Sequence, residues 1–129
     1  MPDARAGGPV QAGAAAADTA YMDASGRPIH SRFEDDPSQA DAIDAFVLAL
    51  AERVDDLQDT EARGDWPRLL ERVNDLASAA DRVGYPVLLQ SAAEVARAAR
   101  DRHAELAHKA LVELTEIARR IRQGHRGSL

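Results

Sequence analysis

Residues 64–89 read GDWPRLLERVNDLASAADRVGYPVLL, and this stretch contains one complete helix signal followed by the start of the next. Asp65 is a preferred N-cap residue, and Pro67 suits the first turn of a helix, where backbone N–H groups have no partner within the helix. The apolar residues that follow recur at helical spacing, at Leu69, Val73, Leu76, Ala80 and Val83. Gly84 is typical of a residue that ends a helix, and Pro86 opens another. The stretch therefore predicts two helices joined by a tight turn.

A helix of the same kind is predicted upstream. Asp36 and Pro37 take the N-cap and first helical positions, and Gln39 takes the third, which resembles a capping box. An apolar stripe then runs to about Glu61, and Gly64 ends the helix. The stripe consists of Ile43, Phe46, Val47, Leu50, Val54 and Leu57.

Two further helices are predicted downstream. The helix that opens at Pro86 has an inward stripe of Leu88 or Leu89, Ala92, Val95 and Ala99. The break before the last helix lies near residues 101–103, where neither glycine nor proline marks it. The last helix ends before Gly124, and its predicted inward stripe consists of Leu106, Ala110, Leu114, Ile117 and Ile121.

These four helices predict an all-α fold, an up-down antiparallel four-helix bundle over residues 32–123. Short connections make successive helices pack as antiparallel neighbours, and each helix needs the others to cover its apolar face. Residues 1–31 are rich in alanine and glycine and show no amphipathic period, so they are predicted to form a flexible N-terminal arm. Residues 124–129 are predicted to be a C-terminal tail.

The composition excludes several classes of protein. The chain of 129 residues has room for one domain, and its lack of cysteine rules out disulfides, thiolate metal sites and cysteine nucleophiles. A net charge of −6 argues against nucleic acid as a partner, because phosphate binding needs a basic surface. No stretch is apolar enough to span a membrane, and Asp3 and Arg5 are not followed by the apolar block of a secretory signal. We therefore expect a cytoplasmic protein that binds neither membrane nor nucleic acid.

The sequence offers little chemistry for catalysis. None of its four histidines lies in an H-E-x-x-H pattern, and no Glu-x-x-His pair occurs on two helices, so no metal ligands are predicted. No P-loop, no G-x-G-x-x-G motif and no G-x-S-x-G motif is present. Paired carboxylates such as Asp55 and Asp56 are expected to face solvent. We therefore expect neither an enzyme nor a bound cofactor.

Three parts of the central stretch match the pattern of a known family. They are the Gly64-Asp65-Trp66 start, residues 69–80 (LLERVNDLASAA) and the Gly84-Tyr85-Pro86 turn. Together they resemble the histidine phosphotransfer (HPt) domains of bacterial two-component phosphorelays, whose central helix commonly carries A-H-x-L-K-G-A and is followed in many members by a G-[FY]-P turn. Upstream, the parts that look like the lead-in helix of such domains are Ser31, Asp35-Asp36-Pro37, Phe46-Val47 and Ala51-Glu52-Arg53-Val54. The resemblance covers about residues 28–121 and implies a response-regulator receiver domain or a sensor histidine kinase as the partner.

The chain departs from the family at the residue that carries the family's chemistry. Alignment on Leu76 and the following turn puts Asn74 where the family has its phosphorylated histidine. Ala77 stands where a lysine is usual, and Ser78 where a glycine is usual. An imidazole nitrogen has a free lone pair that can attack a phosphoryl group, whereas the lone pair of an amide nitrogen is delocalised into the carbonyl. The resemblance therefore implies a protein that is not phosphorylated here and that binds its partner through Glu71, Asn74, Asp75, Ala77, Ser78 and Asp81.

Other interpretations stay open. The polar arc around Asn74 is also what a merely solvated helix face would show. An active phosphotransfer protein would need another histidine, and His103 and His108 are the candidates within the predicted helices. A structural or oligomerising module would use alanine-rich faces, although close packing inside one bundle also accounts for them; such a face is Ala92, Ala93, Ala96 and Ala99. The chain is accordingly expected to be a monomer.

Overall fold

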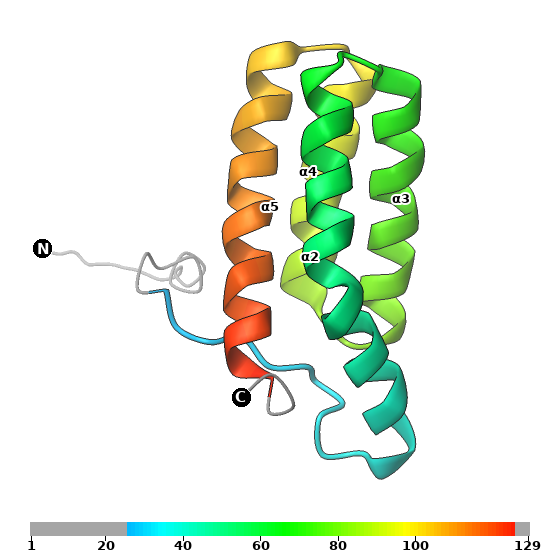
Figure 1. The fold of residues 1–129 in the computed structure, drawn as a ribbon, viewed down its shortest axis with the longest axis vertical. Helices are drawn as coiled ribbons and strands as arrows, with labels where there is room; N and C mark the ends of the chain where they lie inside the picture. Colours follow the sequence, from blue (N-terminus) through cyan, green and yellow to red (C-terminus); the bar gives the residue numbers. More distant parts are fainter. Residues whose placement is uncertain (1–25, 126–129) are drawn as a thin grey trace, which may run out of the picture.

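Four α-helices and one short 3₁₀ turn make up the part of the chain that the computed structural model describes, residues 26–125 (Figure 1). No strand occurs within these residues. The elements are η1 (Pro37–Gln39), α2 (Ala40–Ala62), α3 (Trp66–Arg82), α4 (Pro86–Arg100) and α5 (Ala104–Gly124). The predicted all-α fold with four helices is therefore confirmed. Residues 1–25 and 126–129, which hold most of the predicted arm and tail, lie outside the described residues.

Each helix packs mainly against two others. The main contacts join α2 to α3, α3 to α4, α4 to α5, and α5 back to α2. In Figure 1 the α2–α3 and α4–α5 turns lie at one end of the molecule, and the α3–α4 turn lies at the other. As a result, α3 and α5 stand on opposite sides of the core.

The predicted signals at the ends of α3 act as expected. The Asp65 Oδ1 atom accepts a hydrogen bond from the backbone N–H of Arg68 at 3.3 Å, as an N-cap side chain should. Gly64 and Gly84, before and after the helix, have φ values of +68° and +83°. L-residues with a side chain rarely adopt that backbone conformation, so glycine is favoured at both turns.

The break before α5 lies where the sequence predicted it, although its cap was not foreseen. His103 is the N-cap residue of α5, and its Nδ1 atom accepts a hydrogen bond from the N–H of Leu106 at 3.3 Å. Arg102 takes the left-handed conformation with φ of +53°, a place usually held by glycine or asparagine. The turn is therefore built without glycine or proline, which explains its weak signal in the sequence.

The predicted inward stripe of α5 needs a correction. Leu106 is 52% exposed and Ala110 is only partly buried, whereas Ala107 and Leu111 are buried. The true buried stripe is Ala107, Leu111, Leu114, Ala118 and Ile121, with Ile117 beside it. Both stripes have helical spacing and share their C-terminal members, so periodicity alone does not choose between two phases one residue apart.

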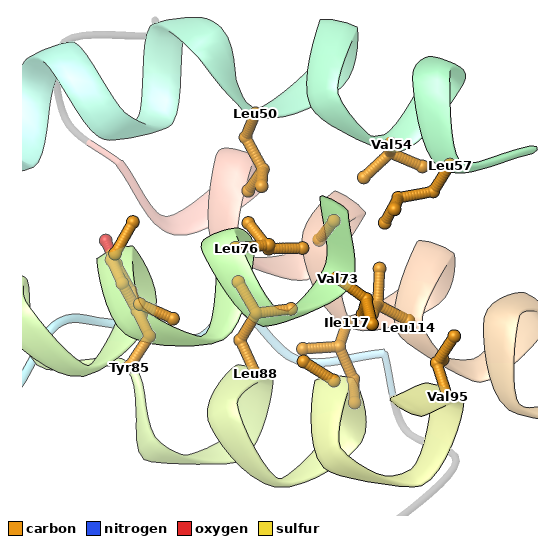
Figure 2. Close-up of a cluster of buried hydrophobic side chains, with 14 of the residues drawn as sticks. Leu50, Val54, Leu57, Val73, Leu76, Tyr85, Leu88, Val95, Leu114 and Ile117 are labelled. Carbon is orange, nitrogen blue, oxygen red and sulfur yellow. The ribbon is translucent and has the colours of Figure 1, made fainter. Parts of the chain in front are cut away.

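The core is formed by side chains from all four helices. Figure 2 shows large apolar residues of each helix directed into the space between them. Almost no surface of these residues is accessible to solvent; they include Leu50 and Leu57 of α2, Val73 and Leu76 of α3, Leu88 and Val95 of α4, and Leu114 of α5. Burial of such side chains contributes roughly 1.5–3 kcal/mol each, and it holds the outward residues of every helix in place.

The segment before η1, part of which was predicted to belong to the arm, packs on the helices. Ser31, placed in the arm by the sequence, is 4% exposed. The N–H of Ile29 donates to the carbonyl of Arg120 at 3.0 Å, and Nε of Arg120 donates to the carbonyl of Arg27 at 2.7 Å. Arg27 and Ile29, which belong to the stretch predicted as the arm, are therefore bonded to Arg120 near the end of α5.

The first two residues of the predicted C-terminal tail also contact the packed part of the chain. Gly124 is the last residue of α5 and approaches Ile29 so closely that a Cβ atom there would lie 2.6 Å from the Ile29 carbonyl oxygen. His125 follows, and its Nε2 atom lies 3.0 Å from Oδ1 of Asp44 in α2. Both residues were assigned to the tail, yet both contact the rest of the fold.

Ser31 joins the segment before η1 to the α3–α4 turn by a hydrogen bond. This contact gives a first prediction. Its hydroxyl donates to the carbonyl of Val83 at 2.6 Å and accepts from the N–H of Phe33 at 2.9 Å. Ser31→Ala removes both bonds and leaves two backbone groups short of a partner, so we expect a loss of about 1–3 kcal/mol in the free energy of unfolding. Urea unfolding of the variant and the natural protein measures this loss in the free energy of unfolding. Ser78→Ala, at an exposed serine, is the control and should change stability by less than about 0.5 kcal/mol.

Candidate functional site

The six residues predicted to bind a partner all lie on α3. We call Glu71, Asn74, Asp75, Ala77, Ser78 and Asp81 together the α3 surface. Five of them are exposed, and Ala77 is partly buried and packs against the core. Because each residue of an α-helix advances by about 100°, the six span roughly 160° of the outer side of α3. The structure therefore brings them together on one continuous surface.

Asn74 lies near the middle of this surface. Its neighbour Val73 is fully buried, and the helical turn carries the Asn74 side chain outward. Within residues 26–125 no side chain of the α3 surface forms a hydrogen bond or an ion pair with another part of the chain. These side chains are held only by their helix, so they are free to contact another molecule.

The borders of the α3 surface differ in character. On one border Trp66, Leu70 and Ala77 are partly buried and pack against the core, which leaves part of each ring or methyl group accessible. On the other border stands Arg72, whose guanidinium donates to the carboxylate of Asp56 in α2. The surface thus has an apolar edge, a central arc with three carboxylates, and an edge formed by the Arg72–Asp56 ion pair.

The two histidines considered as alternative phosphate acceptors lie elsewhere. His103 caps α5 through its Nδ1 atom, so one of its two ring nitrogens is engaged. His108 lies 3.4 Å from Glu61, measured from Nδ1 to Oε1. Both belong to the start of α5, across the core from α3. Neither histidine contributes to the α3 surface.

A small pocket that sequence reasoning did not single out lies near the α3–α4 turn. It has a volume of about 270 Å³, and its lining includes His30, Glu34, Asp44, His125 and Tyr85. Tyr85 is 2% exposed, stacks on Phe46 with ring centroids 5.8 Å apart, and has no hydrogen-bond partner for its hydroxyl among the described residues. The sequence could suggest that the aromatic ring of Tyr85 is buried in the core. It contains no pattern that predicts a hydroxyl without a hydrogen-bond partner.

The environment of Tyr85 predicts a specific dependence of stability on pH. Burial, and to a lesser extent the nearby Glu34 carboxylate, raise the pKa of Tyr85 from 10.0 to about 12. The folded state then holds this proton more tightly than the unfolded state, so the free energy of unfolding should fall as the pH rises from about 10 to 12. Tyr85→Phe should make that fall shallower while changing stability at pH 7 by less than about 1 kcal/mol. Urea unfolding across the pH range tests this, and equal slopes for both proteins would refute it.

The described residues offer no metal centre and no membrane-crossing helix. Nowhere within residues 26–125 do three histidine, aspartate or glutamate side chains come close enough together to hold a metal ion. None of the helices in that part of the chain combines the length and apolar character needed to cross a membrane.

Comparison with known proteins adds no relative. No protein-family model, no curated protein sequence and no solved structure matches the chain. The likeness to HPt domains accordingly rests on the residues themselves: the helix signals around α3, the Gly84-Tyr85-Pro86 turn, and the exposed position of Asn74 between them.

Proposed function

We propose that this protein is an HPt-like domain of two-component signalling that binds a partner without carrying phosphate. The proposal takes the four helices as an up-down antiparallel bundle of the HPt kind, located in the cytoplasm. A single observation carries it: Asn74, aligned with the phosphorylated histidine of the family, lies exposed in the middle of α3 with no partner for its side chain in the described part of the chain.

The residue at this position decides the chemistry. A histidine there could accept a phosphoryl group, because its imidazole has a free lone pair and a pKa near neutrality. The amide of Asn74 has no such lone pair, and Ala77 and Ser78 supply neither the positive charge nor the open approach of the family's lysine and glycine. The same surface can still be recognised by a partner, since recognition requires shape and complementary groups but no nucleophile.

The make-up of the α3 surface suits binding. An apolar edge at Trp66 and Leu70 beside polar side chains is the usual composition of a transient protein interface, in which apolar area and hydrogen bonds both contribute. The carboxylates of Glu71, Asp75 and Asp81 favour a partner that presents a basic rim. On the strength of the resemblance, we propose that this partner is a response-regulator receiver domain or the corresponding region of a sensor histidine kinase, and that it approaches through such a rim.

A binding experiment with one matched control tests this function. Receiver domains and kinase regions from the same organism would be titrated against the protein by calorimetry. Ser78→Arg introduces a large side chain in the middle of the α3 surface and should weaken binding by about 10-fold or more. Ala93→Arg makes the same kind of change at an exposed position of α4 and should leave binding unchanged.

The outcomes of that experiment separate the open interpretations. Binding that is lost in Ser78→Arg and kept in Ala93→Arg supports a docking role for the α3 surface. Binding that is unaffected by Ser78→Arg contradicts it, as does a lack of affinity for every receiver and kinase region. The last result would favour a structural helical module instead.

A further inference from the structure

A groove to which α3 contributes no residue is not explained by the proposed function. It lies between α4 and α5 and has a volume of about 520 Å³. Small residues make it hollow, namely Ser91 and Ala98 of α4 and Ala110 of α5. Leu106, which the sequence placed in the core, stands 52% exposed at one end of the groove.

The groove has two unlike halves. The three residues between α4 and α5, 101–103, form a turn, so positions equally far from this turn lie at the same level on the two helices. The half near the turn, the turn half, contains Leu106, Lys109 and Asp101. The other half, the far half, contains Ser91 and Glu113, with Val87, Gln90 and Ile117.

Several polar groups in the groove have no partner among the residues that the structure describes. Ser91 is 8% exposed, yet its hydroxyl forms no hydrogen bond with any described residue. Lys109 and Glu113 form no ion pair within residues 26–125, whereas the nearby Arg97 is paired with Glu94 at 3.2 Å. A buried hydroxyl without a partner is uncommon, because its desolvation costs free energy that a hydrogen bond would offset.

We infer that this groove binds a second copy of the same chain, in a two-fold symmetric dimer. We place the two-fold axis perpendicular to the groove, so that the turn half of each copy lies against the far half of its partner. The exposed Leu106 side chain then enters the hollow beside Ser91 and Ile117 of the other copy. Because the dimer is symmetric, the Leu106 side chain of each copy fills the hollow of the other, and this contact occurs twice.

The polar groups of the two halves are complementary in the same arrangement. Lys109, a cation in the turn half, faces Glu113, an anion in the far half. Asp101, an acceptor in the turn half, faces the donors Ser91 and Gln90. All of these groups line the groove. When the groove is turned end over end, the cation Lys109 in its turn half meets the anion Glu113 in the far half of the other copy, and this is the reason for choosing a second copy over another protein.

The dimer is compatible with binding at the α3 surface. The groove lies along α4 and α5, whereas Asn74 and its neighbours lie on the outer side of α3, across the core from α5. A dimer would therefore present two α3 surfaces at once and bind a two-fold symmetric partner with increased avidity. This inference departs from the monomer expected from the sequence, and it does not depend on the proposed function.

Sedimentation of the full chain at several concentrations tests the dimer. The wild-type protein should sediment at twice the chain mass of 13.9 kDa at high concentration and dissociate on dilution. Leu106→Glu places a charge in the hollow at two symmetric sites and should raise the dissociation constant by about 100-fold or more. Val112→Glu is the matched control, since Val112 is 55% exposed on the same helix but does not line the groove, and it should leave the dimer intact.

Charge exchange tests the predicted orientation. Lys109→Glu and Glu113→Lys should each weaken the dimer by about 10-fold or more, because each single change sets like charges against each other across the two-fold axis. The double variant should recover the wild-type dissociation constant. A monomer at every concentration would overturn the inference, as would a Val112→Glu protein that dissociates as readily as Leu106→Glu. A double variant that remains as weak as the single variants would overturn the orientation. Circular dichroism confirms that each variant is folded.

Discussion

Replacing Gly84 by alanine is expected to lower the free energy of unfolding by about 2–5 kcal/mol. Two effects act together. The backbone at Gly84 has φ of +83°, where a residue with a side chain is strained. In addition, a Cβ atom there would lie 2.7 Å from Cδ2 of Phe33 and 2.9 Å from Oγ of Ser31. Ser31 is held by its bond to Val83, so the segment before η1 would have to move away from the turn.

The chain offers a control that separates these two effects. Gly64 has nearly the same backbone conformation, with φ of +68°, but no atom lies within 4 Å of the place where its Cβ would be. Gly64→Ala should therefore cost only the backbone strain, about 1–2 kcal/mol. Urea unfolding of both variants measures the difference. Equal losses would show that residues 31–33 do not pack on Gly84 in solution.

Replacing Asn74 by histidine is expected to turn an unreactive protein into one that accepts phosphate. The new imidazole would stand exposed in the middle of the α3 surface, where the proposed function places the phosphoryl group of a bound receiver domain. Incubation with a phosphorylated receiver should therefore place an acid-labile phosphate on Asn74→His and none on the natural protein. The triple variant Asn74→His, Ala77→Lys, Ser78→Gly should be labelled about 10-fold faster or more, because the added cation stabilises the phosphoryl oxygens.

A neighbouring histidine serves as the control for position. Asp75→His places an exposed imidazole one residue further along α3, about 100° around the helix. It should remain unlabelled if transfer depends on alignment with the receiver's phosphoryl group. Label on Asp75→His equal to that on Asn74→His would indicate nonspecific phosphorylation, and label on the natural protein would point to His103 or His108.

The positions of the helices were predictable because their ends carry strong local signals. The ends of α3 depend on local backbone conformation and on contacts between residues close in the sequence. A sequence pattern therefore suffices to locate these ends, which are marked by Gly64, Asp65 and Gly84. The start of α5 was harder to place. Arg102 and His103 form that turn by a left-handed arginine and a histidine cap, and neither residue is a usual signal.

The inward phase of α5 was not predictable for a different reason. Alanine is common in this chain and is found both inside and outside proteins, so Ala107 and Ala110 give no preference. The stripe that starts at Leu106 and the one that starts at Ala107 share Leu114 and Ile121. Only the packing of α5 against the other helices decides that Ala107 is buried and that Leu106 lies at the groove.

The candidate site was predictable in part. The outward direction of Asn74 follows from the helical period of α3, which is well marked by Val73 and Leu76. The unbonded hydroxyls of Ser91 and Tyr85 depend on contacts between segments far apart in the sequence. No local pattern reports whether such a group finds a partner, so both the groove and the small pocket required the structure.

The most direct test of the central claim is a competition experiment. A phosphorylated receiver would transfer its phosphate to a genuine HPt protein in the presence of increasing amounts of this protein. We predict that the natural protein slows the transfer as it occupies the receiver, gains no acid-labile phosphate itself, and loses this effect in the Ser78→Arg variant. Label on the natural protein, or transfer that proceeds at an unchanged rate with every receiver of the organism, would contradict the claim that the α3 surface binds without carrying phosphate.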